Sequence, residues 1–177
     1  MIYYAGIGSR ETPDIVLDNF VLLGALLWSK YGCVLRSGGA NGADSAFERG
    51  VDLYKGKKEI YLPWDSFNQS DSKLIVESEQ AYQLAEKFHP NWDRLGTGAK
   101  KLMARNSHQV LGVDLNTPSS AIICWTRGGL GQGGTGQAIR MAKHYGIPVL
   151  DAGSYSNLKD FNCDVERLFS DLLKETS

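Results

Sequence analysis

Three glycine-rich stretches that also carry hydroxyl and charged side chains stand out in this sequence. Each follows a short apolar run typical of a buried strand, at residues 2–7, 33–36 and 120–125. Glycine lets backbone amides approach an anion closely, because it has no Cβ atom and adopts positive φ readily. Three such loops at three strand ends favour one shared site for a phosphate-bearing ligand.

The last of these stretches leads into a helix predicted over residues 135–145, whose N-terminal amides and dipole favour a phosphate. Thr135 would add a hydroxyl donor, and residues 37–39 would form a second anion site. Arg10 and Arg36 would supply positive charge. The candidate ligand-binding residues from these loops are Gly8, Ser9, Arg10, Arg36, Ser37, Gly38, Gly39, Asn41, Asp44, Trp125, Gly133, Gly134, Thr135 and Gly136.

Several of these residues can instead have purely structural roles. Arg10 can be a surface residue at a helix start, and Arg36 can form an ion pair with Asp44 or Glu48. Asp44 can accept a hydrogen bond from a ribose hydroxyl or cap its own helix. Trp125 ends its strand beside the last glycine-rich loop, where it either touches the ligand or packs against the protein.

The segment between residues 64 and 98 is the least regular part of the sequence. Its aromatic residues Trp64, Phe67 and Trp92 can stack on a base, but packing in the core or in a lid is the more common role of such residues. Whether this segment covers the pocket is left open by the sequence.

Composition and charge exclude several other classes of function. His89 and His108 lack metal-ligand spacing, so neither a metal nor another cofactor is expected. Cys33, Cys124 and Cys163 are far apart and odd in number, which favours reduced thiols and a cytoplasmic location. The net charge of −1 gives no general attraction to nucleic acids or anionic membranes. No signal peptide is evident, and no apolar run approaches the roughly 18 residues of a membrane span.

The elements that must position the three loops alternate along the chain. Strands are predicted at residues 2–7, 33–36, 59–63, 120–125 and 146–150, and helices at 13 to about 31, 43–54, 73–88, 98–111, 135–145 and 163–175. This alternation predicts an α/β, Rossmann-like fold: a mostly parallel sheet with helices on both faces, in a single domain over residues 1–177. Ligands of such sheets bind at the carboxyl ends of the strands.

The order of these motifs resembles the SLOG superfamily. It runs from Gly8-Ser9-Arg10 through Ser-Gly-Gly-Ala-Asn-Gly-Ala-Asp at residues 37–44 and Ala104-Arg105-Asn106 to Gly-Gly-Thr-Gly at residues 133–136. The superfamily includes the Rossmann-like domain of DNA-processing protein A, the Lonely guy phosphoribohydrolases and sensor domains for cyclic ADP-ribose-type signals. The resemblance covers about residues 1–150 and is nearest to the DNA-processing branch. It adds Arg105 and Asn106 to the candidate ligand-binding residues.

The sequence departs from the phosphoribohydrolase motif, Pro-Gly-Gly-x-Gly-Thr-x-x-Glu, at two positions. Gln137 stands in place of the threonine, and Arg140 in place of the glutamate that takes part in catalysis. The resemblance therefore implies no catalytic residue here, unless the fold brings Glu48, Glu59 or Asp151 close to the ligand.

Together these features predict non-catalytic binding of a small phosphate-bearing nucleotide of the ADP-ribose or cyclic-nucleotide type. Such a protein would act as a sensor or would sequester a signalling nucleotide, as in phage counter-defence. One alternative is a nucleotide N-glycosidic hydrolase. Another is a binder of single-stranded DNA, in which Lys100, Lys101, Arg105 and Arg140 form a basic groove rather than solvated helix charges.

A homo-oligomer is expected, because domains of this superfamily often pair through helix faces. The predicted C-terminal helix carries Val165, Leu168, Phe169 and Leu172 on one face. This apolar face either forms an interface between copies or packs on its own sheet.

Overall fold

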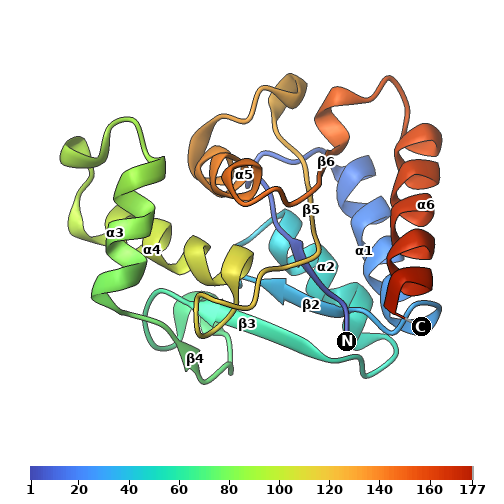
Figure 1. The fold of residues 1–177 in the computed structure, drawn as a ribbon, viewed down its shortest axis with the longest axis horizontal. Coiled ribbons are helices and arrows are strands. Elements are labelled where there is room, and N and C mark those ends of the chain that lie inside the picture. Colours follow the sequence, from blue (N-terminus) through green and yellow to red (C-terminus); the bar gives the residue numbers. More distant parts are fainter. Residues whose placement is uncertain (177) are drawn as a thin grey trace.

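The computed structural model describes residues 1–176, and its central feature is a sheet of six parallel strands (Figure 1). These are β1 (Tyr3–Gly6), β2 (Val34–Ser37), β3 (Lys58–Leu62), β4 (Leu74–Ile75), β5 (Ala121–Cys124) and β6 (Val149–Asp151), in the spatial order β4-β3-β2-β1-β5-β6. The chain moves outward from β1 to β4 and then returns to the other side of β1. The strand order thus reverses between β1 and β5, where ligands of α/β sheets bind.

Helices cover both faces of this sheet. One face carries α1 (Asp14–Ser29), α2 (Ala43–Asp52) and α6 (Leu158–Thr176), and the other carries α3 (Glu79–Phe88), α4 (Thr97–Leu111) and α5 (Gly133–His144) (Figure 1). Short 3₁₀ turns lie in the connections: η1 (Phe67–Gln69), η2 (Trp92–Arg94), η3 (Arg127–Gly129) and η4 (Ala152–Ser154). The expected α/β, Rossmann-like architecture of one domain is confirmed.

Two cores form because successive strand side chains point to opposite faces. Tyr4, Leu35 and Ile123 belong to the core beneath α1, α2 and α6, where the rings of Phe20 and Phe47 stack with centroids 4.3 Å apart. The other core lies beneath α3, α4 and α5 and is built from smaller side chains. This core lets α4 and α5 approach the sheet closely.

Glycines bring α1 and α2 together at backbone distance. A Cβ atom at Gly24 would lie 2.6 Å from the carbonyl oxygen of Phe47, and one at Gly50 would overlap the carbonyl oxygen of Val21. The N-terminus of α2 is held in the same way, because a Cβ atom at Gly8 would lie 2.6 Å from the Cβ of Ala43. These contacts fix the start of α2, and with it Asp44, against the end of β1.

The predicted helix over residues 73–88 is wrong in its first part. Leu74 and Ile75 form β4, paired in parallel with Tyr61 and Leu62. The helix α3 starts only at Glu79, after Ser78 accepts a hydrogen bond from the amide of Ala81 at 3.1 Å. A strand of two residues is too short to show a period, which explains why the sequence pattern missed it.

The apolar face of α6 packs on its own domain. Phe161, Val165 and Phe169 are buried in the core beneath α1, and Leu168 and Leu172 pack against that core. This arrangement matches the second of the two roles expected for the C-terminal helix, so its apolar face is not available to another copy. Within residues 1–176, none of the helices combines the length and the apolar character that crossing a membrane requires.

A candidate ligand pocket at the strand ends

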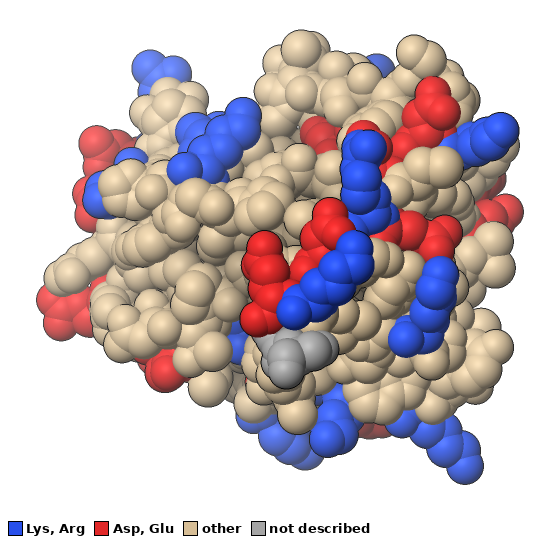
Figure 2. All heavy atoms as spheres, turned by 45° about the vertical axis from the view of Figure 1, so that its right-hand side comes forward, with Lys and Arg blue, Asp and Glu red and all other residues tan. Residues whose placement is uncertain are grey.

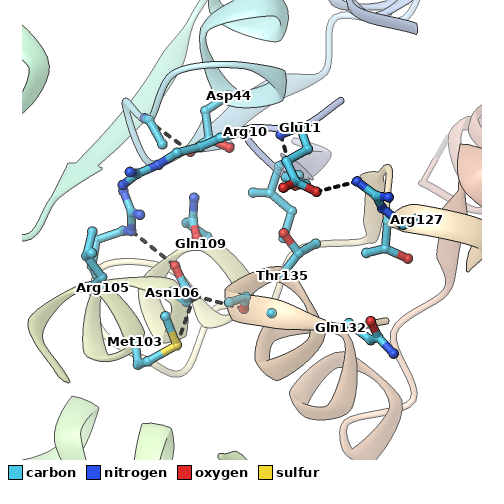
Figure 3. Close-up of a pocket in the computed structure, with 18 residues that line it drawn as sticks. Arg10, Glu11, Asp44, Met103, Arg105, Asn106, Gln109, Arg127, Gln132 and Thr135 are labelled. Atoms are coloured by element: carbon cyan, nitrogen blue, oxygen red, sulfur yellow. Dashed lines mark hydrogen bonds and ion pairs between the residues drawn. The ribbon is translucent and has the colours of Figure 1, made fainter. Parts of the chain in front are cut away.

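A pocket of about 520 Å³ lies at the carboxyl ends of β1 and β5, beside α4 and the first turn of α5 (Figure 3). It is lined by Ile7, Gly8, Ser9, Arg10, Glu11, Ala40, Asp44, Leu102, Met103, Arg105, Asn106, Gln109, Thr126, Arg127, Gln132, Gly133, Gly134 and Thr135. Its position coincides with the reversal of strand order. The expectation that the three glycine-rich loops approach one another is therefore met by the fold.

The turn after β1 presents Arg10 to the pocket. The hydroxyl of Ser9 accepts a hydrogen bond from the amide of Glu11 at 3.0 Å, and the carbonyl of Ser9 accepts one from the hydroxyl of Thr12 at 2.6 Å. This compact turn directs the Arg10 side chain along the pocket toward Arg105 (Figure 3). Arg10 is exposed and has no ion-pair partner among residues 1–176.

Arg105 is a second arginine in the pocket, but it is only 4% exposed. Its guanidinium donates to the carbonyl oxygens of Gly38 and Tyr61 and, at 3.2 Å, to the side-chain oxygen of Asn106. Burial lowers the pKa of Arg105, Asp44 opposes this shift, and the like charge of Arg10 adds to it. Two guanidinium groups facing one cavity create a strong local preference for an anion.

Asp44 is the buried counter-charge of Arg105. Its carboxylate accepts hydrogen bonds from the amides of Gly38 at 3.1 Å and Ala40 at 3.4 Å, so the loop before α2 folds around it. Burial raises the pKa of Asp44 to about 6, although Arg105 and these amides limit the rise. The amide of Gly38, which was expected to bind a phosphate, therefore donates to Asp44 instead.

Residues 37–39 consequently lie outside the pocket lining. The Gly38 amide is bonded to Asp44, and the Ser37 hydroxyl donates to the carbonyl of Gly6 at 2.6 Å. Gly38 has to be a glycine for another reason, since a Cβ atom there would overlap the guanidinium of Arg105. The second anion site expected at this loop is therefore not part of the pocket, and neither Gly39 nor Asn41 lines it.

Arg36 does not reach the pocket either. Its guanidinium is 2% exposed, bonds to Glu59 at 2.7 Å and to the carbonyl of Thr117, and stacks on the ring of Tyr3 at 4.0 Å. Arg36 thus forms an ion pair, as the structural interpretation predicted, but its partner is Glu59 rather than Asp44 or Glu48. The side chain anchors the loop between α4 and β5 and is fully engaged there.

The N-terminus of α5 forms the centre of the pocket. Gly133, Gly134 and Thr135 open the helix, and no side chain caps their amides, which the helix itself leaves unpaired. Asn106 ties this turn to α4, because its amide nitrogen donates to the carbonyl of Gly134 at 3.2 Å. Gly136 faces away from the pocket, where a Cβ atom would overlap the carbonyl of Gly131.

A surface ion pair joins the two loops that flank the pocket. Glu11, after β1, and Arg127, after β5, approach to 2.9 Å (Figure 3).

Glu11 and Arg127 were not among the predicted site residues, although Glu11 directly follows Arg10, which was predicted. Gln109 lines the pocket and was not predicted either. It lies one helical turn after Arg105, and this spacing could have indicated it. Trp125 is half-buried and does not line the pocket.

The three carboxylates considered for catalysis do not line the pocket. Glu48 pairs with Lys58, Glu59 pairs with Arg36, and Asp151 accepts hydrogen bonds from the backbone of Thr126 and Gly153. Arg140, at the position of the family glutamate, donates to the carbonyl of Phe88 at 2.7 Å and does not line the pocket.

The four cations considered for a basic groove have separate partners. Arg105 is buried in the pocket, Lys101 pairs with Glu77, Lys100 lies over the ring of Trp92, and Arg140 bonds to α3. On the face that carries α6, basic and acidic side chains are interspersed (Figure 2). No lining residue comes from the segment 64–98, which therefore does not form a lid over the pocket in this structure.

Comparison with known proteins identifies a structural relative rather than a sequence family. No family model matches the chain, and no curated protein matches it. DNA processing protein A from Helicobacter pylori, whose structural study describes a unique mode of single-stranded DNA binding, superposes with a TM-score of 0.60. The match covers 98% of this chain and 81% of that one at 20% sequence identity. At this identity the likeness shows that the chain has a Rossmann-like fold similar to that of DNA processing protein A.

Proposed function

We propose that the chain binds a small phosphate-bearing nucleotide, of the ADP-ribose or cyclic-nucleotide type, and does not convert it. The observation that carries this proposal is the unpaired Arg10, which faces the buried Arg105 beside the open N-terminus of α5. An anion in this space would relieve the repulsion between the two guanidinium groups. It would also accept hydrogen bonds from helix amides that point at it already.

The charges of the pocket support an anionic ligand. Its lining contains three arginines and two carboxylates, which leaves one positive charge uncompensated. The dipole of α5 adds a partial positive charge at the same place. Because Arg105 and Asp44 are buried, their fields are screened less than those of surface groups.

The remaining lining residues suit the rest of a nucleotide. Ile7, Leu102 and Met103 form an apolar wall against which a base or a sugar can pack. Asn106 and Gln109 offer amide groups for the polar edge of a base or for sugar hydroxyls. The volume of about 520 Å³ lies within the range of pockets for small ligands, roughly 300–1,000 Å³.

Binding without turnover is supported by the position of the acidic residues. Cleavage of an N-glycosidic bond needs a carboxylate that can approach the reacting sugar. Asp44 is held by two backbone amides and Glu11 is paired with Arg127, while Arg140 replaces the family glutamate. A protein of this kind would act as a sensor or would sequester a signalling nucleotide, as a counter-defence protein does.

Single-stranded DNA is the second candidate ligand, and the likeness to DNA processing protein A favours it. A DNA strand would place one backbone phosphate between Arg10 and Arg105. Further phosphates would then need cations along the surface, and binding would weaken steeply with salt. The net charge of −1 favours the small ligand.

Thermal-shift measurements followed by mass analysis test these alternatives. We would compare AMP, ADP-ribose, cyclic ADP-ribose isomers, cyclic dinucleotides and short single-stranded DNA. A nucleotide that stabilises the protein and is recovered unchanged after heat release supports the proposal. A ligand recovered in cleaved form would establish a hydrolase, and a shift with DNA alone would establish the second candidate.

Substitution of Arg10 tests the position of the site. We expect Arg10→Ala to weaken nucleotide binding by at least about tenfold, the effect of losing one charge-assisted hydrogen bond, while the melting temperature without ligand stays unchanged. Arg94→Ala is the matched control, because Arg94 is an exposed arginine outside the pocket. Equal affinities of both variants, measured by calorimetric titration, would place the ligand elsewhere.

A further inference from the structure

The ion pair at the outer end of the pocket is not explained by phosphate binding alone. Glu11 and Arg127 approach to 2.9 Å although their side chains are 69% and 76% exposed. They come from the turns after β1 and β5, which are adjacent strands but far apart in sequence. An exposed pair of this kind contributes at most about 1 kcal/mol to stability, so stabilising the fold is a weak reason for its presence.

This ion pair divides the pocket into two electrostatic regions. The inner region contains Arg10 and Arg105, with Asp44 as the buried counter-charge of Arg105. The outer region contains Arg127, whose charge is neutralised by Glu11. Figure 3 shows Arg10 and Arg105 on one side of the pocket and the pair of Glu11 and Arg127 on the other. The uncompensated positive charge is therefore confined to the inner region.

We propose that Glu11 determines which nucleotides the pocket accepts, by excluding those that end in a diphosphate or triphosphate. Glu11 is then a specificity-determining residue that favours ligands of lower charge, such as ADP-ribose, over ADP and ATP. This inference rests on the proposed function, because it concerns the same pocket and the same class of ligand.

The chemistry of the phosphates gives the physical reason. The diphosphate of ADP-ribose is esterified at both ends and carries two negative charges, whereas the terminal phosphate of ADP or ATP ionises again with a pKa near 6. One phosphate-bearing group is satisfied by the inner region. The additional terminal charge would lie against the carboxylate of Glu11 or would have to displace it from Arg127. Like charges placed together in this way discriminate against the wrong ligand.

Glu11→Gln separates the charge of this side chain from its shape. In the variant, Arg127 becomes an uncompensated cation and offers a second site for a phosphate. We expect wild-type protein to bind ADP-ribose at least about fivefold more tightly than ATP, a factor that one exposed charge contact can supply. In Glu11→Gln this preference should disappear or reverse, through a gain in ATP affinity rather than a loss in ADP-ribose affinity.

Two further variants provide the controls. Glu77→Gln makes the same change in net charge outside the pocket, at an exposed residue paired with Lys101, and should behave as wild type. The double variant Glu11→Gln/Arg127→Gln restores the charge balance of the outer region. It should lose the gain in ATP affinity expected of Glu11→Gln, because no cation then faces the terminal phosphate, and its preference should lie between those of wild type and Glu11→Gln.

Calorimetric titration of all four proteins with ADP-ribose, ADP and ATP, in buffer containing a chelator, distinguishes the possible failures. A wild-type preference that Glu11→Gln removes supports the inference. An unchanged ratio of affinities in Glu11→Gln, or equal binding of ATP and ADP-ribose by wild type, would overturn it and leave nucleotide binding established. Absence of binding by ADP-ribose, ADP and ATP would overturn this inference, and absence of a thermal shift with the cyclic nucleotides as well would overturn the proposed function.

Discussion

We expect the proposed nucleotide binding to depend on pH through Asp44. Burial raises the pKa of its carboxyl group to about 6, and protonation would leave a further positive charge of the pocket uncompensated. Anion binding therefore favours the protonated form and is coupled to proton uptake. We expect the affinity for ADP-ribose to rise several-fold from about pH 7.5 to about pH 5.5, because the ligand itself does not titrate in this range.

Asp44→Asn is the matched variant for this prediction, since an amide oxygen can still accept from Gly38 and Ala40. Titration calorimetry should show a nearly flat pH profile for the variant. A wild-type affinity that falls on acidification would contradict the coupling of anion binding to proton uptake.

The carboxyl group of Asp44 also affects folding. Its pKa is raised above the ordinary value of 3.8, so the native state binds the proton more tightly than the unfolded chain does. Its contribution to stability is therefore present at low pH and is lost as pH rises through about 6.

Residue types alone did not distinguish an arginine that binds ligand from one that holds the fold. Arg10 and Arg36 both follow or end a strand, and both were expected at the phosphate. Arg10 lies in a turn and forms no ion pair among residues 1–176, whereas the neighbouring strand places Glu59 beside Arg36. The difference depends on strand register, which a single sequence does not reveal. Glu11 was missed because its partner Arg127 lies on a turn that is distant in the sequence.

At the scale of elements, the crossing of α1 and α2 determines where the loop with Asp44 lies. A methyl group at Gly50 would overlap the carbonyl of Val21 and lie 2.9 Å from the amide of Ala25. Overpacking of this kind costs about 1–3 kcal/mol, so we expect Gly50→Ala to lower the free energy of unfolding by that amount in urea denaturation. Gly98→Ala is the control, because this helical position is open and alanine is the better helix former. Equal midpoints for both variants would show that the helices can move apart freely.

Strands and helices with a clear hydrophobic pattern were predicted well, whereas the roles of some glycines in the loops between them were predicted wrongly. The strands β1, β2, β3, β5 and β6 overlap the predicted runs, because each contains a short apolar stretch. Gly38 and Gly136 were assigned to ligand contact, but both allow close approach of other protein groups. A glycine required by packing has the same sequence appearance as one required by a phosphate. Only the three-dimensional contacts separate the two roles.

At the scale of the whole molecule, the pocket exists because β1 lies in the middle of the sheet. Its neighbours β2 and β5 are separated by nearly half of the sequence, yet the loops after all three strands approach one another. Alternating strands and helices predicted a mostly parallel sheet, but the order of the strands has no signature in the local sequence. The meeting of the loops could therefore be expected in general terms, while the particular lining residues could not.

Because the pocket joins loops from both halves of the chain, a ligand there binds the native state and has no equivalent site in the unfolded chain. At a free concentration of about 100 times Kd, we expect ligand to add about 2.7 kcal/mol to the free energy of unfolding. For a domain of this size the melting temperature should rise by roughly 5–10 °C. Differential scanning calorimetry over a range of ADP-ribose concentrations measures this, and the rise should continue with the logarithm of concentration above Kd. A shift that stays constant above saturation, or one that persists in Arg10→Ala, would mean that the ligand stabilises the protein from a different place than the pocket between β1 and β5.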